Sequence, residues 1–335
     1  MNRETRMPAE YEPHEKTLMS WPVGENMCYP ENYHEFSSEL ARAAVSISRF
    51  EPVAMLVNGN ETDEAVLKLQ GCAEIIEISH NDCWIRDNGP TVVLSGKNHR
   101  IGINWMFNAW GEKYPKYHLD NLAAPKILRH MSIAEMAVPL VMEGGSFHTD
   151  GEGTLLTTEE CLLNKNRNPH ISRKDIENTL KETLGIEKII WFPKGLFGDE
   201  TDGHIDNLAC FASSGSILLQ VCENPADPDY ERSREHIRIL KNETDAKGRR
   251  INIIPVPQPQ VCLYRNRHLT LSYLNFYFVN NGIVFPVFNQ ATDLKALEIM
   301  STVFPERDII TLDGLKLAKE GGNIHCLTQQ IPRAT

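Results

Sequence analysis

The stretch Asp199-Glu200-Thr201-Asp202-Gly203-His204-Ile205-Asp206-Asn207 lies between segments with different backbone signals. Before it, the pattern predicts a helix over residues 172–184 and a strand over residues 188–192. After it, the polar turn at residues 213–215 predicts a hairpin. The predicted unit is therefore a helix, a strand, an acid-rich loop and a hairpin, and this order decides the expected fold.

The same order recurs along the chain. In one copy, a predicted helix over residues 34–50 presents apolar residues with helical spacing, and the proline at position 52 ends it. The other predicted elements are strands over 53–57, 73–78, 91–94, 251–256, 269–279, 283–288 and 308–312, helices over 62–70, 230–247 and 293–304, and a return strand around Cys326.

The spacing of four candidate site residues suggests internal repetition. Asp87 and Glu143 are 56 positions apart, Glu143 and His204 are 61 apart, and His204 and Cys326 are 122 apart, which leaves room for one more loop near residues 265–268. We therefore expect an α/β fold with five modules of about 60 residues that present their loops to a common axis, as in a propeller. The alternative is an open parallel sheet, but tight polar turns favour antiparallel pairing within each module.

Composition limits the class of protein. The 335 residues, 41% of them apolar, can bury a large core, and no linker or low-complexity segment divides the chain, so we expect one domain over residues 1–335. No apolar run approaches the roughly 18 residues of a membrane helix, and the first residues are polar, so we expect a cytoplasmic protein. The net charge of −11 disfavours nucleic acid and anionic membranes as partners and suits a small cation.

The eight cysteines are scattered without C-x-x-C spacing, which argues against a zinc ribbon and a disulfide framework. Most are expected to be reduced core residues. Cys326 differs, because it follows the glycine pair of Glu320-Gly321-Gly322-Asn323-Ile324-His325-Cys326, where a ligand or backbone can approach closely. Upstream, residues 81–90, 143–151 and 199–207 are rich in acids and glycine, so the chain offers a nucleophile, a base and several carboxylates.

Each candidate also has a structural interpretation. His204 and Asp206 share one face if their segment is a strand, but a lone histidine is often a surface residue. Asp87 could be a turn residue without a catalytic role, Glu143 could be solvated, and Cys326 could be a small buried apolar residue. In a return strand, the neighbouring His325 would point away from Cys326 and be structural.

The residue types indicate the chemistry. One thiolate with hard carboxylates does not form a familiar metal site, and a cysteine protease needs donors around its oxyanion, whereas this chain supplies acceptors. Paired carboxylates recognise a guanidinium best, because it matches them with parallel N–H donors. A thiolate could attack its central carbon, and a histidine could protonate the departing ammonia and then activate water.

Five ordered motifs spread over nearly the whole chain carry a resemblance to a known family. They are Trp84-Ile85-Arg86-Asp87-Asn88-Gly89-Pro90, Phe107-Asn108-Ala109-Trp110-Gly111, Glu143-Gly144-Gly145-Ser146, Thr201-Asp202-Gly203-His204-Ile205-Asp206 and Gly321-Gly322-Asn323-Ile324-His325-Cys326. The chain resembles the agmatine deiminases and related bacterial peptidylarginine-deiminase-like proteins of the guanidino-modifying pentein superfamily.

The resemblance implies a five-bladed β/α propeller without a cofactor or metal. It implies these roles: Cys326 as nucleophile, His204 as acid and base, Glu143 as its orienting group, Asp87 and Asp206 as the guanidinium clamp, and Trp84, Trp110 and Asp202 as further substrate contacts. The implied reaction, a step of putrescine biosynthesis, hydrolyses agmatine to N-carbamoylputrescine and ammonia. Peptidylarginine or free arginine is the alternative substrate, and a catalytically silent binding module or an amidino transferase is the alternative class.

Some positions depart from the family pattern. Glu112 replaces a glycine, Cys83 a serine or threonine, and Glu320 the first of three glycines. Glu112 could hold the distal amine of agmatine or be solvated. Arg265 or Arg267 could instead bind the carboxylate of free arginine. The sequence leaves open whether the protein is a homo-oligomer.

Overall fold

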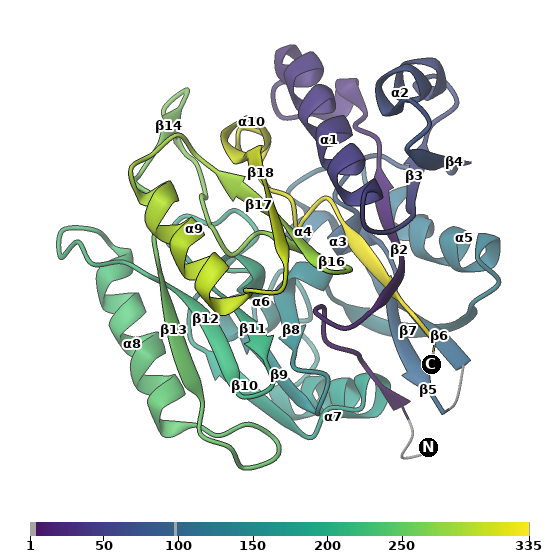
Figure 1. Cartoon of the computed structure of the whole chain (residues 1–335). Helices are drawn as coiled ribbons and strands as arrows, with labels where there is room; N and C mark the ends of the chain where they lie inside the picture. The colour runs from purple at the N-terminus through teal and green to yellow at the C-terminus, as the bar shows by residue number, and fades with distance from the viewer. Residues whose placement is uncertain (1–4, 97–98, 335) are drawn as a thin grey trace.

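The strands form five sheets of three or four strands and one two-stranded ribbon within residues 5–96 and 99–334, which the computed structural model describes (Figure 1). In hydrogen-bonded order they are β1-β5-β6-β7 (Thr5–Arg6, Thr91–Ser95, His99–Met106, Ala134–Val141), β10-β9-β8 (Lys188–Phe192, Thr154–Thr158, Phe147–Thr149), β11-β12-β13 (Ala209–Ser213, Ser216–Val221, Asn252–Pro257), β16-β17-β18 (Tyr277–Val279, Gly282–Val287, Asp308–Asp313), β19-β2-β3-β4 (Gln329–Pro332, His14–Ser20, Val53–Val57, Ala73–Glu77) and the ribbon β14-β15 (Leu263–Tyr264, Arg267–His268).

Each of the five larger sheets combines an antiparallel pair with a parallel pair. For example, β16 and β17 pair antiparallel with Phe278 opposite Ile283, and β17 and β18 pair parallel with Ile283 opposite Ile309. The expected hairpin is therefore present in this sheet, and a third strand adds in parallel to it. The alternative of one open parallel sheet is wrong, because the strands form separate mixed sheets.

Helices connect the parallel strands and lie toward the outside of the molecule, as Figure 1 shows for α5, α7 and α8. The longer helices are α1 (Tyr33–Ser48), α2 (Thr62–Leu69), α5 (Ala123–His130), α7 (Arg173–Leu184), α8 (Asp229–Asn242) and α9 (Thr292–Val303), and the short ones are α3 (Ile85–Asn88), α4 (Ala109–Glu112), α6 (Glu159–Leu162), α10 (Gly314–Ala318) and the 3-10 turns η1 (Gly24–Asn26), η2 (Pro30–Asn32), η3 (Asp120–Leu122), η4 (Gly144–Ser146) and η5 (Ile205–Asn207). No helix in the described part of the chain is long and apolar enough to cross a membrane.

The apolar face expected for α1 is buried in the structure. Phe36, Leu40 and Ile47 on this face are at most 1% exposed and belong to the same apolar cluster as Cys326. Burial of such a side chain contributes about 1.5–3 kcal/mol to folding. This helix therefore supports the part of the core that holds the candidate nucleophile.

The two ends of the chain meet in one sheet. β19 pairs antiparallel with β2, with Gln329 opposite Leu18, and Figure 1 shows the C-terminal strand beside β2. Residues 324–327, which lie one residue before β19, form a turn. The predicted return strand around Cys326 is therefore wrong: the strand begins at Gln329, and Cys326 lies in the turn before it.

Three other predicted elements differ from the structure. The predicted strand over 269–279 is regular only from Tyr277, because residues before it turn around the Ser272 hydroxyl, which accepts from the Leu274 N–H. α8 ends at Asn242, five residues before the predicted end. The loop expected near residues 265–268 is the turn and second strand of the β14-β15 ribbon. All eight cysteines are free thiols, and five of them are buried.

Candidate active site

Three loops that are far apart in the sequence meet at Gly145. A Cβ atom built on this glycine would lie 2.6 Å from His204 Nδ1, 2.8 Å from Asp206 Oδ2 and 3.0 Å from Asp87 Oδ1. Such contacts would displace the three groups, so this position requires a residue without a side chain. The structure thus brings together three of the residues that the sequence analysis selected.

Asp87 lies in α3 and is held through both carboxylate oxygens. Oδ2 accepts a hydrogen bond from Trp110 Nε1 over 2.9 Å, and Oδ1 accepts one from the Gly145 backbone N–H over 2.9 Å. Burial raises the pKa of Asp87, although the neighbouring His204 acts in the opposite direction. The two hydrogen bonds fix the orientation of a carboxylate that would ionise more readily beside a cation.

His204 lies between two carboxylates. Its Nδ1 is 3.9 Å from Asp87 Oδ2, and its Nε2 is 3.8 Å from Glu143 Oε2. Burial alone would lower the pKa of His204, but Asp87 and Glu143 raise it well above the usual value. Neither ring nitrogen has a hydrogen-bond partner among the described residues, so both stay available to a ligand or to water.

His204 and Asp206 do not share the face of a strand, as the sequence analysis expected. Residues 205–207 form the 3-10 turn η5, and His204 precedes it with φ −55° and ψ 141°. Asp199 fixes this loop, because its Oδ2 accepts a hydrogen bond from the His204 backbone N–H over 3.1 Å. The turn still directs both side chains toward Gly145.

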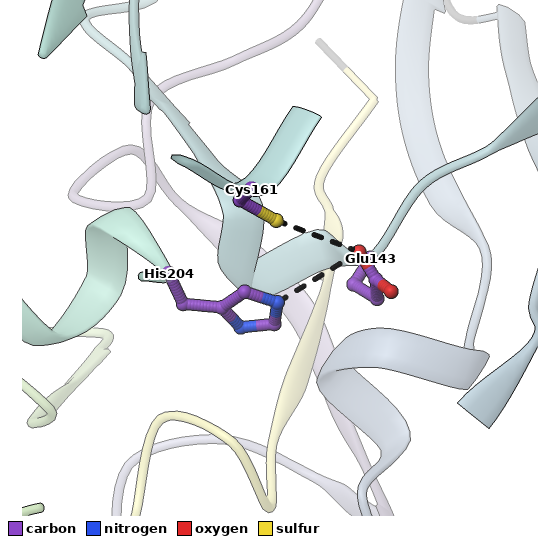
Figure 2. A group of neighbouring side chains, drawn as sticks. All are labelled: Glu143, Cys161 and His204. Atoms are coloured by element: carbon purple, nitrogen blue, oxygen red, sulfur yellow. Dashed lines mark hydrogen bonds and ion pairs between the residues drawn. The ribbon is translucent and has the colours of Figure 1, made fainter. Parts of the chain in front are cut away.

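Glu143 contacts three side chains, those of His204, Cys161 and Arg167. Figure 2 shows Glu143 facing both His204 and Cys161, and the Sγ of Cys161 donates to Glu143 Oε2 over 3.9 Å. On the other side, Arg167 Nε donates to Glu143 Oε1 over 2.7 Å. Burial opposes ionisation of Glu143, but Arg167 and His204 together lower the pKa of this carboxyl. A fully buried anion is therefore held next to His204.

Glu143, Cys161 and His204 also have the residue types of a metal site, since their donor atoms lie within 4.8 Å of one another. The buried Arg167 guanidinium already neutralises Glu143 at 2.7 Å. A metal cation at this position would lie close to that positive charge. We therefore assign the three side chains to the environment of His204.

Asp206 is hydrogen-bonded to the imidazole of His325. The distance from His325 Nδ1 to Asp206 Oδ2 is 2.9 Å, and His325 Nε2 lies 2.9 Å from Glu10 Oε2. Burial would raise the pKa of Asp206, but His325 lowers it overall. The expectation that His325 points away from the site is therefore wrong, because a turn rather than a strand carries it.

Cys326 is 6% exposed and faces one of the candidate clamp carboxylates. Its Sγ lies 3.6 Å from Asp206 Oδ2 and 3.2 Å from Asn275 Nδ2. Burial, together with the negative charges of Asp206 and Asp87, raises the pKa of Cys326 well above its usual value. The sulfur is therefore a thiol until a cation offsets these charges.

A narrow cavity reaches the sulfur of Cys326. The volume in which the centre of a water molecule fits is about 30 Å³. The residues that line the cavity include Cys326, Asp87, Trp84 and Trp110. Gly322 allows the Trp84 ring to lie against the backbone, since a Cβ atom there would be 2.4 Å from ring carbon Cζ3. The cavity therefore has aromatic walls, a carboxylate and a thiol, which suits a slender cation.

Three further carboxylates, those of Asp82, Glu200 and Glu320, line the same cavity. Burial raises the pKa of Asp82 to about 7 and also raises the pKa of Glu200 and Glu320. These groups are therefore sensitive to the charge of any molecule that enters.

Several residues that the sequence analysis selected are not part of the cavity lining, among them Glu112, Glu143, Asp202, His204 and Asp206. Asp202 accepts from Lys113 Nζ and Arg167 Nη1, each over 2.7 Å, so it belongs to a neighbouring ion-pair network. Glu112 is exposed, as its solvated alternative requires.

Comparisons with known proteins place this geometry in a family. A family model described as Porphyromonas-type peptidyl-arginine deiminase matches residues 6–332. The chain belongs to this family. Among the relatives it matches is a protein of Legionella pneumophila named as a putative agmatine deiminase, which is 43% identical, with 98% of this chain and 95% of the relative covered.

Solved structures of the family superpose closely on the chain. The agmatine deiminase of Enterococcus faecalis is similar with a TM-score of 0.94 and 33% identity, covering 99% of this chain and 97% of that one. The DDAH of Pseudomonas aeruginosa is similar with a TM-score of 0.52 and 11% identity, covering 95% of this chain and 100% of that one. The second likeness concerns the fold alone, which is a mixed α/β fold.

The sequence analysis missed several residues that support the site of this family member. Arg167 and Cys161 are isolated in the sequence, and Glu10 precedes the first predicted helix, so no local pattern marked them. Asn275 lay within a predicted strand and was read as part of it. Their positions became visible only once the loops were brought together.

Proposed function

We propose that the protein is an agmatine deiminase that hydrolyses the guanidinium group of agmatine to N-carbamoylputrescine and ammonia. The observation that carries this proposal is the position of Cys326 beside the buried carboxylates of Asp206 and Asp87 in a narrow cavity. A nucleophile in such negative surroundings is suited to a substrate that is itself a cation. Membership of the deiminase family supports the same reaction.

The residues divide the reaction into two steps. A guanidinium bound between Asp87 and Asp206 lowers the pKa of Cys326, whose proton is released to solvent. The thiolate then forms a C–S bond with the central carbon, and the C–N bond breaks as the His204 imidazolium protonates the departing ammonia. This leaves an S-amidino intermediate on Cys326 and a neutral His204.

In the second step, the neutral His204 accepts a proton from water. The resulting hydroxide attacks the same carbon, and the C–S bond then breaks while the new hydroxyl group releases its proton to solvent, which yields the neutral ureido product and the Cys326 thiolate. The anionic Glu143, 3.8 Å from His204 Nε2, stabilises the imidazolium form that begins and ends the cycle. Arg167 keeps Glu143 ionised and in place.

The charges along the cavity favour agmatine over free arginine. The carboxylates of Asp82, Glu200 and Glu320 would attract the distal ammonium of agmatine and repel the α-carboxylate of arginine. Arg267 does not compensate, since it pairs with Glu200, and Arg265 pairs with Glu31 at 2.5 Å. We therefore place free arginine and peptidylarginine behind agmatine.

The alternatives of another class have less support. A catalytically silent binding module has no need of Cys326, His204 and the buried Glu143 in one place. An amidino transferase would pass the amidino group to an amine instead of water, whereas the family to which the chain belongs is described as a deiminase family. Hydrolysis needs no second organic substrate.

We also propose the finer form of the fold and the setting of the protein. The five larger sheets would be the blades of one propeller within a single catalytic domain, which agrees with their common pairing pattern. We keep the cytoplasm as its location and agmatine as its small-molecule partner.

The test is a comparison of ureido product and ammonia formed from agmatine, free arginine and a blocked arginine peptide. We expect turnover of agmatine, much slower turnover of the other two, and none by Cys326→Ala. Turnover of the peptide alone would instead indicate a protein-modifying deiminase. A lack of turnover of all three would overturn the proposed function.

A further inference from the structure

Asn275 is a buried asparagine that contacts Cys326 at three points. Its Oδ1 accepts a hydrogen bond from the Cys326 backbone N–H over 3.3 Å and, while the sulfur is a thiol, can accept another from Sγ over 3.5 Å. Its Nδ2 lies 3.2 Å from Cys326 Sγ and can donate once the sulfur is ionised. The residue is 1% exposed and lies in the irregular segment before β16. It therefore approaches the sulfur from the protein interior.

The surroundings of Asn275 determine which end of its amide faces the sulfur. An amide can be placed in two orientations related by a flip, but a backbone N–H can only donate, so it requires Oδ1 opposite Cys326 N. Nδ2 also donates to Asn207 Oδ1 over 2.9 Å, and Asn207 Nδ2 lies 3.5 Å from the Asp199 carboxylate. The Asp199 carboxylate can only accept, so Asn207 turns its Nδ2 toward Asp199 and its Oδ1 toward Asn275. Asn275 must then donate through Nδ2, and this same group faces the sulfur of Cys326.

Such a donor matters at the sulfur because the neighbouring carboxylates disfavour the thiolate. Asp206 Oδ2 lies 3.6 Å from Sγ, and the charge of Asp87 acts in the same direction. Two hydrogen bonds favour the ionised sulfur, one from the backbone of Asn323 and one from the side chain of Asn275. A neutral amide can do this without neutralising the carboxylates that a cationic substrate requires.

We propose that Asn275 is a catalytic residue that stabilises the Cys326 thiolate through its Nδ2–H. The hydrogen bond is made when the thiol loses its proton and again when sulfur leaves the S-amidino intermediate. The amide keeps its own hydrogen throughout. The inference rests on the proposed covalent function, but the ionisation of the sulfur can be measured without any substrate.

The experiment compares the alkylation of Cys326 by iodoacetamide at neutral pH in the wild type, Asn275→Ala and Asn275→Asp, with the labelled peptide identified by mass. We expect the rate constant to fall about tenfold or more in Asn275→Ala, because loss of a hydrogen bond to a charged group shifts a pKa by about one unit or more. Asn275→Asp should react more slowly still, since it adds a negative charge.

A merely structural role predicts the opposite result, because loosened packing would expose Cys326 and speed its alkylation. Asn280→Ala is the matched control: Asn280 makes a similar pair of hydrogen bonds to the His14 backbone, away from the site. Its loss should leave the rate unchanged. If Asn275→Ala and Asn275→Asp do not fold, Asn275→Ser, which keeps a small polar group, replaces them.

Unchanged or faster alkylation in the folded Asn275 variants would overturn the proposal. Slower alkylation would support it whether or not the wild type turns over agmatine, so a failure of the proposed function is recognised separately. If agmatine is turned over, kcat of Asn275→Ala should also fall by about tenfold or more with little change in KM.

Discussion

His325 and Asp206 lie 2.9 Å apart in the protein interior, with the imidazole Nδ1 facing the carboxylate Oδ2. The other ring nitrogen lies 2.9 Å from Glu10 Oε2, so two carboxylates share one imidazole. An ionised carboxylate can only accept a hydrogen bond, so each ring nitrogen must carry a hydrogen. His325 is therefore a buried cation beneath the side chain proposed to bind the guanidinium.

Replacement of His325 by glutamine should weaken the enzyme most at low pH. The histidine lowers the pKa of Asp206, so its loss should raise that pKa, and the ionised carboxylate would be lost at a higher pH as the solution is acidified. We expect the acid limb of the kcat/KM profile for agmatine to move to higher pH in His325→Gln. An acid limb at the wild-type position would contradict this role.

Replacement of Trp110 by phenylalanine should remove one hydrogen bond from Asp87 and keep an aromatic wall. A hydrogen bond to a charged group contributes about 1.5–3 kcal/mol, so kcat/KM for agmatine should fall roughly 10- to 100-fold. Trp191→Phe is the matched control, because Trp191 Nε1 donates to Glu177 over 3.0 Å, outside the site. Equal losses of kcat/KM in the two variants would contradict the proposal that the Trp110 hydrogen bond orients Asp87.

Replacement of Arg167 by methionine should leave Glu143 as an unpaired buried anion. Breaking a buried ion pair from one side costs about 3–5 kcal/mol of the free energy of unfolding, which denaturant titration can measure. The double variant Arg167→Met with Glu143→Gln should recover part of this loss, because the unpaired charge at position 143 is then absent. Absence of recovery would show that the loss has another cause.

His236 should make the protein less stable in mild acid. Burial lowers the pKa of His236 from 6.5 to about 4, and Nε2 lies 2.9 Å from the Lys194 carbonyl oxygen. Between these values the unfolded chain binds the proton and the folded protein does not, so stability falls as pH decreases from above 6.5 toward 4. The contribution of one such group is about 3 kcal/mol.

The check on this contribution is His236→Gln, which keeps an N–H donor but does not titrate. Its free energy of unfolding should depend less on pH than that of the wild type over the same range. Identical slopes for the two proteins would contradict the assignment.

Local patterns predicted much of the secondary structure. The strands Val53–Val57 and Lys188–Phe192 agree with their predicted bounds, because short apolar runs between turn residues leave little freedom in assigning them. The strand His14–Ser20 was missed, since it pairs with Gln329–Pro332 at the far end of the chain. Such pairing depends on the whole fold, and no local pattern reports it.

The sequence predicted the candidate catalytic residues but not the buried residues that support them. Asp87, His204 and Asp206 were selected because acids and glycines gather around them in the sequence, and the structure places them around Gly145. His325 was misread because a strand was assumed where the chain turns. Glu10 and Arg167 are isolated charged residues in the sequence. In the structure each is buried next to an opposite charge, and no local pattern indicates this pairing.

The most direct test of the central claim is the mass of Cys326 peptides after agmatine and enzyme are mixed and the reaction is stopped in acid at short times. Covalent catalysis predicts a transient adduct on Cys326 with the mass of agmatine less ammonia, which disappears as product accumulates. Undiminished turnover by Cys326→Ala, or an adduct formed only on another thiol such as Cys83, would contradict it.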